Sequence, residues 1–531
     1  MSNGVPSGIL SVRAVIRDRC ADTRGQESQS SVRSLLTSGL SARLEMDFRI
    51  ILVVSLAFAI GHSQEATKNE TVKPNNGNIV SEKNGTSLPS LCTICNCTGD
   101  SINCSNRGLV NHFEESQWPN ISISMASFNN NSLVHLKAFP KLTIRKLILR
   151  HNQITKIDDS AFKQLINLTE LDLSHNQLTS ELLLPHVFQG RFSPESYEPL
   201  AKLAVLNLGH NVLHSLHQSI FEHLSNLKVL SLAGNPLAAI DLRTSIAISN
   251  LMYLEELDLS YCNLLDIPDL QFRTLRRLKK LNLSGNRFLF MPAALNQVSS
   301  LEMLSLDENP IAVIDHLHTV PSLPSLKMLS LCCMPHLEHI GKGALSGFTG
   351  LEILRIKNCP KLEEIDEEAL NNDGAVWPAL KKLDLSDNAL RYLPALLVGR
   401  WDWLEELGLM NNKWSCDCEN QYLIAALLPK YGRKLMNDEL DKLVCAAPPE
   451  YEGRNLTSLS HKKLRCLDLY EAQPEKDAAV LVGMLIGLLL AIPLGLAIFV
   501  FWRRGFFFCG TQGPASFSRA FYKRTANDDD L

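Results

Sequence analysis

A short pattern of leucines and one asparagine recurs along the middle of the chain. The segment LTELDLSHNQL, residues 168–178, has leucines at its first, fourth, sixth and eleventh positions and Asn176 at its ninth. A strand alternates apolar side chains every second residue and a helix every third or fourth, so neither explains the whole segment. Only its centre, with Leu171 and Leu173, is typical of a short half-buried strand.

The same eleven-residue pattern returns in segments such as LKVLSLAGNPL, LKKLNLSGNRF and LKKLDLSDNAL. Twelve copies align, most of them 21 to 29 residues apart, and their ninth positions are Asn131, Asn152, Asn176, Asn211, Asn235, Cys262, Asn286, Asn309, Met334, Cys359, Asn388 and Asn412. A fixed period of this length indicates a solenoid, in which stacked turns together bury a face that no single turn can bury.

These segments resemble the leucine-rich repeat family, whose pattern L-x-x-L-x-L-x-x-N/C-x-L they match almost letter for letter. The resemblance implies an α/β solenoid with a curved parallel sheet on one side and a mostly irregular or short-helix convex side. With strands about 4.8 Å apart, twelve of them span on the order of 50 Å. We expect the asparagine amides to bond backbone groups of neighbouring turns, and Cys262 and Cys359 to be small buried substitutes.

Clustered cysteines flank the repeats, with Cys92, Cys95, Cys97 and Cys104 before them and Cys416, Cys418, Cys445 and Cys466 after them. They resemble the capping flanks of extracellular leucine-rich repeat proteins. The resemblance implies four disulfides, Cys92–Cys97, Cys95–Cys104, Cys416–Cys445 and Cys418–Cys466. Spacing alone leaves three connectivities for each set of four. A zinc site is the weaker alternative, because other features indicate an oxidising compartment.

Residues 478–502, AAVLVGMLIGLLLAIPLGLAIFVFW, carry no charge and are long enough to cross a bilayer as a helix. Arg503 and Arg504 follow directly, which predicts a cytoplasmic C-terminus and a type I plasma membrane protein. A second apolar run, residues 50–60, is typical of a signal peptide if translation starts at Met46. A signal anchor with a cytosolic, Arg- and Ser-rich head is the alternative.

The predicted organisation follows from these segments. It comprises an N-terminal extension of doubtful status (1–45), a signal peptide (46–63), a flexible stalk (64–91), an N-terminal cysteine-rich cap (92–120), the repeats (121–411), a C-terminal cysteine-rich cap (412–466), a linker (467–477), the transmembrane helix (478–502) and a cytoplasmic tail (503–531).

Nine Asn-x-Ser/Thr sequons precede the apolar helix and agree with an extracellular location. They are Asn69, Asn84, Asn96, Asn103, Asn120, Asn130, Asn167, Asn282 and Asn455. Asn282 stands at the fifth position of its repeat, where the side chain faces the concave surface of the sheet. A glycan there divides the concave face, so either the site is unmodified or a ligand contacts only part of the arc.

Ligands of this family usually meet the concave face, to which the third, fifth and seventh positions project. Glu256 and Asp258 precede Lys280, and Lys382 precedes Glu406, so the plainer interpretation of these charges is a self-neutralising, solvated surface. An apolar column at the third position predicts a protein-binding interface, and it comprises Val205, Val229, Met303, Met328 and Ile353. The alternative is that insertions or glycans cover these side chains.

Three histidines, His151, His175 and His210, occupy the eighth position of consecutive copies. Neighbouring strands bring them within range of a metal ion or a pH switch, although histidine is also a common filler there. Cys332 and Cys333 leave three alternatives, which are burial as small residues, a Cys333–Cys359 bond, or an intermolecular bond. The insert of residues 181–202 predicts a loop beside the convex side or edge.

The tail is too short for a signalling domain. Cys509, just beyond RRGFFF, is a candidate for palmitoylation. Asp529 and Leu531 in the terminal NDDDL resemble an acidic-type PDZ ligand, for which a charged solubilising end is the alternative.

The sequence holds no Gly-rich phosphate loop, His-Glu-x-x-His helix or serine elbow, so we expect neither an enzyme nor a cofactor. The net charge of −4 does not indicate binding to nucleic acid, so we expect no nucleic acid partner. The resemblance, to adhesion and recognition members of insect or trophoblast-glycoprotein-like type, implies a receptor for an extracellular protein or for the same protein on a neighbouring cell. Alternatives are a co-receptor or modulator of a secreted ligand, and a pattern-recognition receptor without its own signalling domain.

Overall fold

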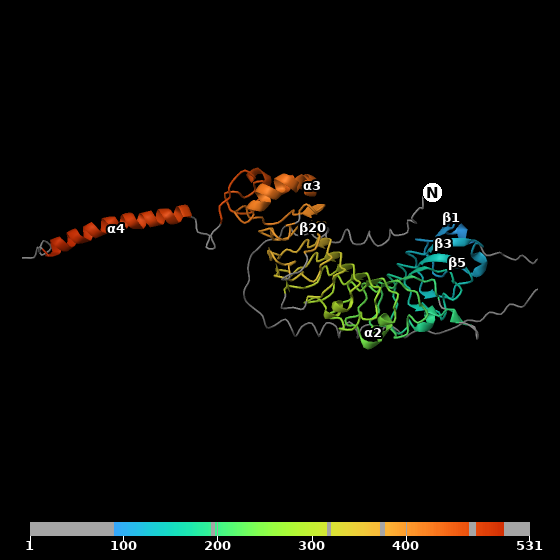
Figure 1. Ribbon diagram of the computed structural model, residues 1–531. Coiled ribbons are helices and arrows are strands. Elements are labelled where there is room, and N and C mark those ends of the chain that lie inside the picture. Colours follow the sequence, from blue (N-terminus) through green and yellow to red (C-terminus); the bar gives the residue numbers. More distant parts are fainter. Residues whose placement is uncertain are drawn as a thin grey trace, which may run out of the picture.

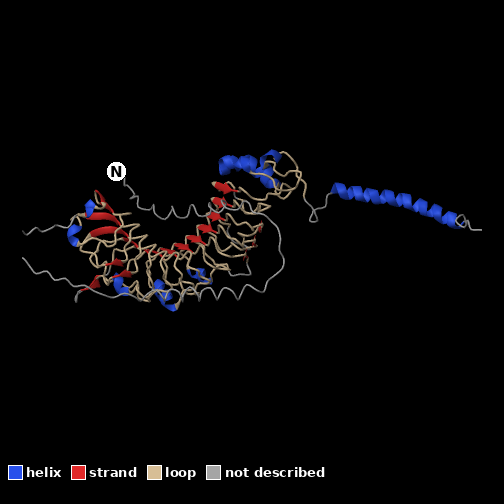
Figure 2. Cartoon of the chain, turned by 180° about the vertical axis from the view of Figure 1, so that it is seen from behind, coloured by secondary structure: helices blue, strands red, loops and turns tan. Residues whose placement is uncertain are grey.

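The computed structural model describes residues 90–192, 197–198, 200–315, 320–371, 377–399, 401–466 and 474–503. The predicted extension and signal peptide, and the tail beyond Arg503, lie outside the described residues. The repeats and both flanks form one curved solenoid, with the strands of its large sheet in a row along the inner side and short helices outside (Figures 1 and 2).

The large sheet has fourteen strands, in the order β1-β2-β3-β5-β7-β10-β11-β12-β13-β14-β16-β18-β20-β21. β1 and β2 belong to the N-terminal flank and pair antiparallel, and all later pairings are parallel. The bounds are β1 Asn96–Thr98, β2 Ser101–Asn103, β3 Ser122–Ser127, β5 Thr143–Ile148, β7 Glu170–Asp172, β10 Val205–Asn207, β11 Val229–Ser231, β12 Glu256–Asp258, β13 Lys280–Asn282, β14 Met303–Ser305, β16 Met328–Ser330, β18 Ile353–Arg355, β20 Lys382–Asp384 and β21 Glu406–Gly408. Each of the twelve predicted repeats supplies one strand of this sheet, from β3 onward.

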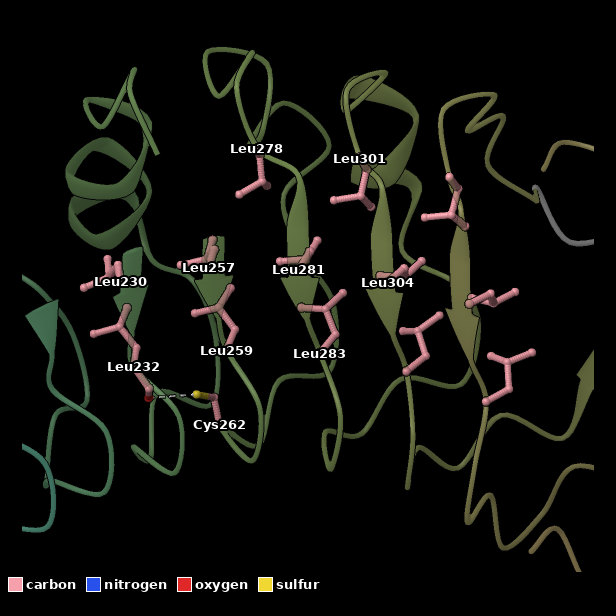
Figure 3. Close-up of a cluster of buried hydrophobic side chains, with 14 of the residues drawn as sticks. Leu230, Leu232, Leu257, Leu259, Cys262, Leu278, Leu281, Leu283, Leu301 and Leu304 are labelled. Carbon is pink, nitrogen blue, oxygen red and sulfur yellow. Dashed lines mark hydrogen bonds between the residues drawn. The ribbon is translucent and has the colours of Figure 1, made fainter. Parts of the chain in front are cut away.

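The repeat leucines explain the register of this sheet. Leu257 pairs with Leu230 on one side and Leu281 on the other, because the fourth position is the centre of every three-residue strand of the repeats. Side chains at the first, fourth and sixth positions stack with their counterparts in neighbouring turns, as Leu278, Leu281 and Leu283 do in Figure 3. They are at most 2% exposed and form one continuous core with the leucines of adjacent turns.

The ninth-position asparagines bind successive turns together, as predicted. Asn176 donates from Nδ2 to the carbonyls of Leu149 and Leu173 at 3.0 and 2.9 Å, and its Oδ1 accepts from the Ile154 amide at 3.1 Å. One side chain thus satisfies three buried backbone groups, two of them in the preceding turn. The same bonds recur from Asn211 to Asn412 wherever asparagine is present.

The secondary-structure elements on the convex side are short and irregular. It holds the helix α2 (Leu242–Ser249), the 3₁₀ helices η4 (Pro185–Phe188) and η5 (Ala293–Gln297), and the two-residue strands β4 His135–Leu136, β6 Lys156–Ile157, β15 Val313–Ile314, β17 His339–Ile340 and β19 Glu364–Ile365. β4 pairs with β6, and β15, β17 and β19 form a minor parallel sheet. The insert includes η4 and an antiparallel pair, β8 (Arg191–Phe192) and β9 (Tyr197–Glu198).

Disulfides close both flanks. The bonds are Cys92–Cys97, Cys95–Cys104, Cys416–Cys445 and Cys418–Cys466, the pairs that the resemblance implies. The N-terminal flank begins with a 3₁₀ helix, η2 (Leu91–Thr93), and has a second, η3 (Glu115–Gln117). The C-terminal flank contains the π-helix η6 (Leu423–Gly432), α3 (Arg433–Met436), and the 3₁₀ helices η7 (Asn437–Lys442) and η8 (Leu456–Leu459).

A separate helix, α4 (Pro474–Arg503), includes the predicted apolar span. Its residues Ala478–Arg503 are long and apolar enough to cross a membrane, and none of its most apolar window is buried against other parts of the protein. The helix is therefore a candidate membrane span, because a core helix of similar composition would be buried.

Candidate functional site: the concave face

The third-position column lies on the concave face in direct register. Met303 pairs with Met328 and Met328 with Ile353. In the same column, Val205 pairs with Val229, and these residues lie four and three turns before Met303. All five side chains are half-buried rather than exposed. Neighbouring apolar side chains therefore cover part of one another, and the column offers a low apolar ridge instead of a pocket.

Ion pairs interrupt this ridge. Lys280 Nζ lies 2.5 Å from Glu256 Oε1, between the two apolar stretches, and Lys382 lies 2.6 Å from Glu406 beyond the second stretch. Lys146 and Glu170 form a third such pair at 2.6 Å. The concave charges are thus largely neutralised by neighbours, as the sequence predicts, although Asp258 bonds Ser260 rather than Lys280.

The fifth position carries polar side chains that bond forward to the end of their own strand. Asn282 Oδ1 accepts from the backbone amide and hydroxyl of Ser284, at 3.1 and 2.7 Å. The chain of bonds continues from Ser284 Oγ to Ser305 Oγ at 2.7 Å, and from Ser305 Oγ to Asp307 Oδ2 at 2.9 Å. Asn282 is therefore fixed within a polar network in the middle of the face.

Two carboxyl groups on this face, Asp258 and Asp307, are half-buried. Burial raises the pKa of Asp258 despite the bonds it accepts from Ser260, and it raises the pKa of Asp307 in the same way. Asp307 Oδ1 also accepts from the Cys332 backbone amide at 2.7 Å. Asp258 therefore fixes the end of its own strand, and Asp307 also links two successive turns.

Every eighth-position residue adopts a left-handed backbone conformation, with φ between +52° and +68° from His151 to Asn411. This shared geometry points the eighth-position side chains along the solenoid, and the rings of His151, His175 and His210 stack with centroids 4.2 Å apart. Burial, followed by the neighbouring histidines, lowers the pKa of His175 to about 4. Stacked faces do not converge on an ion, and no metal-binding group of three or more ligand side chains occurs among the described residues.

Two cysteines replace the asparagine in function as well as in size. The thiol of Cys262 donates to the Leu232 carbonyl at 3.3 Å, and that of Cys359 donates to the Leu331 carbonyl at 3.3 Å. Both are buried, and burial raises both thiol pKa values to about 12. Cys359 is a free thiol, so the alternative of a Cys333–Cys359 bond is wrong. Cys332 is half-buried and also free, and burial raises its pKa to about 11.

Other predicted sites lie away from the face. The sequons Asn96, Asn103, Asn120 and Asn130 are exposed near the N-terminal end, and Asn167 and Asn455 are half-buried. Asn69, Asn84, Cys509, Asp529 and Leu531 lie outside the described residues, so glycosylation, lipidation and PDZ binding there stay predictions.

Large apolar side chains are exposed in three consecutive turns, a feature that the sequence analysis did not identify. Leu265 and Leu289 are 66% and 59% exposed, and they lie in adjacent turns because the Arg287 amide donates to the Leu264 carbonyl at 2.8 Å. Leu242 and Leu270 are also exposed, at 76% and 61%. These four residues stand outside the conserved positions of the repeat, so only the structure shows their exposure.

A second missed feature runs along the edge of the concave face, at the second position of the repeat. Eight consecutive turns there alternate strictly in charge, and we call this row the rim ladder. It comprises Lys228, Glu255, Lys279, Glu302, Lys327, Glu352, Lys381 and Glu405. Aligning the copies and reading down the second column would have found it.

Comparisons with known proteins show similarity to leucine-rich repeat proteins. A family model described as leucine rich repeat matches residues 143–191, 201–255 and 252–311. The chain is 31% identical over 256 residues to Tsukushi of Mus musculus, covering 48% of this chain and 61% of that protein. It is 29% identical over 381 residues to Transforming growth factor beta activator LRRC32 of Pongo abelii, covering 59% and 55%.

Trophoblast glycoprotein of Macaca fascicularis is 26% identical over 314 residues, covering 55% of this chain and 60% of that protein. The chain thus spans less than two thirds of the length of each of these relatives.

Proposed function

We propose that this chain, which carries leucine-rich repeats in a solenoid with disulfide-linked flanks, is a cell-surface recognition or adhesion receptor. It binds a protein ligand through its concave face. The ligand contacts the third-position column, centred on Met303, Met328 and Ile353. Binding requires no catalytic step or cofactor. The helix α4 spans the plasma membrane, and the ectodomain lies outside the cell.

The in-register column is the observation that carries this proposal. Three adjacent strands present unbranched or β-branched apolar side chains at one height, and the next strand outward on each side presents Lys280 or Lys382. An apolar centre with a charged border is the usual composition of a protein interface. Methionine also adapts its shape to a partner at little cost.

The full-length chain displayed on cells tests the proposal against a panel of secreted and cell-surface proteins. We expect Met328→Glu to weaken capture of any ligand found by about tenfold or more, because it places a charge in the apolar centre. Leu265→Glu is the matched control, since it introduces the same charge on the outer surface. Equal loss in both variants, or loss in neither, contradicts binding through the concave face.

The second candidate function is that of a co-receptor or modulator of a secreted ligand. Similarity to a protein named as an activator of transforming growth factor beta favours it. Aggregation of cells that express the full chain supports adhesion, whereas capture of a soluble growth factor by the same cells supports the modulator. Binding to microbial glycans or lipids instead indicates the pattern-recognition alternative.

The membrane arrangement has its own test. Antibodies against the C-terminal flank should stain intact cells, whereas antibodies against the last residues should stain only permeabilised cells. The reverse pattern contradicts the type I orientation.

A further inference from the structure

The rim ladder alternates Lys and Glu over eight turns without interruption, from Lys228 to Glu405. Each member donates its backbone amide to the carbonyl of the member before it, as from Glu255 to Lys228 at 2.7 Å and from Lys327 to Glu302 at 2.8 Å. The ladder therefore continues the hydrogen bonding of the parallel sheet along one edge and follows its curvature. The leucines directly before two members, Leu278 and Leu301, lie at the same level in neighbouring turns (Figure 3).

The ion pairs within the ladder leave much of each charged group in water. Lys228 pairs with Glu255 at 3.0 Å, Lys327 with Glu302 at 2.9 Å, and Lys381 with Glu352 at 2.8 Å. The three lysine side chains are nevertheless about half exposed, at 52%, 54% and 47%. Exposed pairs of this kind contribute little to folding, so their outward surfaces remain available to a partner.

The spacing of the ladder restricts what that partner is. Like charges recur every second turn, at about 9.6 Å, because neighbouring parallel strands lie about 4.8 Å apart. An extended peptide places same-side residues about 6.8 Å apart, and a helix has a pitch of about 5.4 Å, so neither matches over eight members. Another parallel-stranded solenoid has the same spacing and stays in register along its whole length.

A second copy of this chain also has the right sequence of signs. An alternating row with an even number of members becomes its own complement when it is reversed. In an antiparallel pair, Lys228 faces Glu405, Glu255 faces Lys381, Lys279 faces Glu352, and Glu302 faces Lys327. A two-fold axis between the turns of Glu302 and Lys327 produces this arrangement, which is the symmetry that most protein dimers adopt.

We propose that two copies of this chain associate antiparallel along their rim ladders, about a two-fold axis between Glu302 and Lys327. The rim supports close approach at this axis, because the residues before the first leucines of these two repeats are the small Ser300 and Ser325. Towards one end of the ladder the rim carries apolar contact area, with Met252 63% and Tyr253 42% exposed. The solenoid is curved (Figure 2), and a two-fold axis along the radius of its arc gives the second copy the same curvature.

Predicted glycosylation leaves this edge clear. Asn167 precedes Leu168 at the rim just as Asn226 precedes Leu227, and it lies two turns before the ladder begins. Within the turns that carry the ladder, the only sequon is Asn282, which faces the concave side instead of the rim. This dimer uses a different surface from the concave column, so it does not depend on the proposed ligand site.

An inverted ladder tests the proposal while keeping opposite charges next to each other along the ladder of one chain. Exchanging every Lys and Glu of the ladder, from Lys228→Glu to Glu405→Lys, preserves the alternation and hence the internal ion pairs. Full-length chains with two different tags are co-expressed, solubilised in detergent and captured by one tag. We expect the wild type to capture the wild type and the inverted chain to capture the inverted chain.

The mixed pair is the decisive measurement, since all eight facing positions then carry like charges. We expect its capture to fall by about tenfold or more, because like charges facing each other across an interface are strongly unfavourable. An unchanged melting temperature of the inverted chain shows that it has folded. Equal capture of the mixed pair, or no self-capture of the wild type, overturns the proposal.

A concave-face variant separates this result from ligand binding. Met328→Glu should leave self-capture unchanged, because the dimer does not use the third-position column. Loss of self-capture in Met328→Glu contradicts the rim as the interface.

Discussion

The ring of Tyr261 occupies the space above Gly285 in the next turn. A Cβ at Gly285 would lie 2.2 Å from Tyr261 Cδ1, and the Tyr261 hydroxyl donates to Glu308 Oε1 at 2.6 Å in the turn beyond. Both Tyr261 and Gly285 are eighth-position residues with left-handed backbone, at φ +55° and +65°. The eighth column is therefore a packed row in which a large side chain and a glycine complement each other.

Replacing this glycine should be costly. Gly285→Ala combines left-handed strain with a clash against Tyr261, and we expect the free energy of unfolding to fall by about 3 kcal/mol. Gly453→Ala is the control, because Gly453 has φ +74° but nothing within 4 Å of its Cβ position. It should cost only about 1 kcal/mol. If chemical denaturation gives the same loss of unfolding free energy for both variants, the contact with Tyr261 does not contribute to the cost.

The asparagine bonds make a second prediction. Asn235 is fully buried, donates to the carbonyls of Leu208 and Leu232, and accepts from the Leu213 amide. Asn235→Ala leaves these groups unpaired and should reduce the free energy of unfolding by about 3 kcal/mol or more.

Asn235→Cys is the matched variant, because Cys262 retains a bond to a carbonyl of the preceding turn. It should cost about 1 kcal/mol less than alanine. A cysteine variant no more stable than the alanine variant would mean that the thiol bond is ineffective.

The histidine stack predicts an acid-sensitive region. The pKa of His175 is lowered from 6.5 to about 4 by burial, His210, His151 and Arg150, against an opposing effect of Asp172. The folded pKa is the lower one, so the unfolded chain binds the proton more tightly. The stabilisation is therefore complete above about pH 6.5 and is lost as the pH falls towards 4.

Because His175 is substantially exposed, solvent screening limits this loss to about 1 kcal/mol. His175→Asn should remove it, since asparagine occupies the same left-handed position at Asn130 and Asn411. The check is the difference in melting temperature between neutral and acidic buffer. An identical pH dependence in wild type and variant would contradict the prediction.

The stabilisation that each disulfide contributes should increase with the length of chain that it closes. Cys416–Cys445 spans 29 residues and Cys92–Cys97 spans 5. Chain entropy predicts about 4 kcal/mol for the first and about 2 kcal/mol for the second. Replacing each pair with alanine and measuring urea unfolding gives the two values. If replacing the pair that closes the shorter loop lowers the unfolding free energy more, strain or packing outweighs chain entropy.

The sequence predicts those parts of the fold that the repeat pattern determines. Leu257 and Asn176 occupy the positions that the template assigns, because burial and backbone pairing leave no alternative there. The facing of Lys280 and Glu256 follows from the same register.

Other features depend on backbone geometry that residue type does not reveal. Tyr261 and Glu308 have positive φ values although neither residue favours them, since the turn imposes the conformation on whatever residue stands eighth. The stacking of His175 follows from that imposed direction. The exposed group around Leu265 arises on the convex side, where turns differ in length and no common register applies.

The sign alternation of the rim makes the number of turns matter in a way that burial does not. Loss of the single turn that contains Glu302 would bring Lys279 beside Lys327, while the leucine core could close without a fault. Removal of two successive turns would restore opposite neighbours. Shortening or lengthening of this part of the chain over evolution should therefore proceed by even numbers of turns.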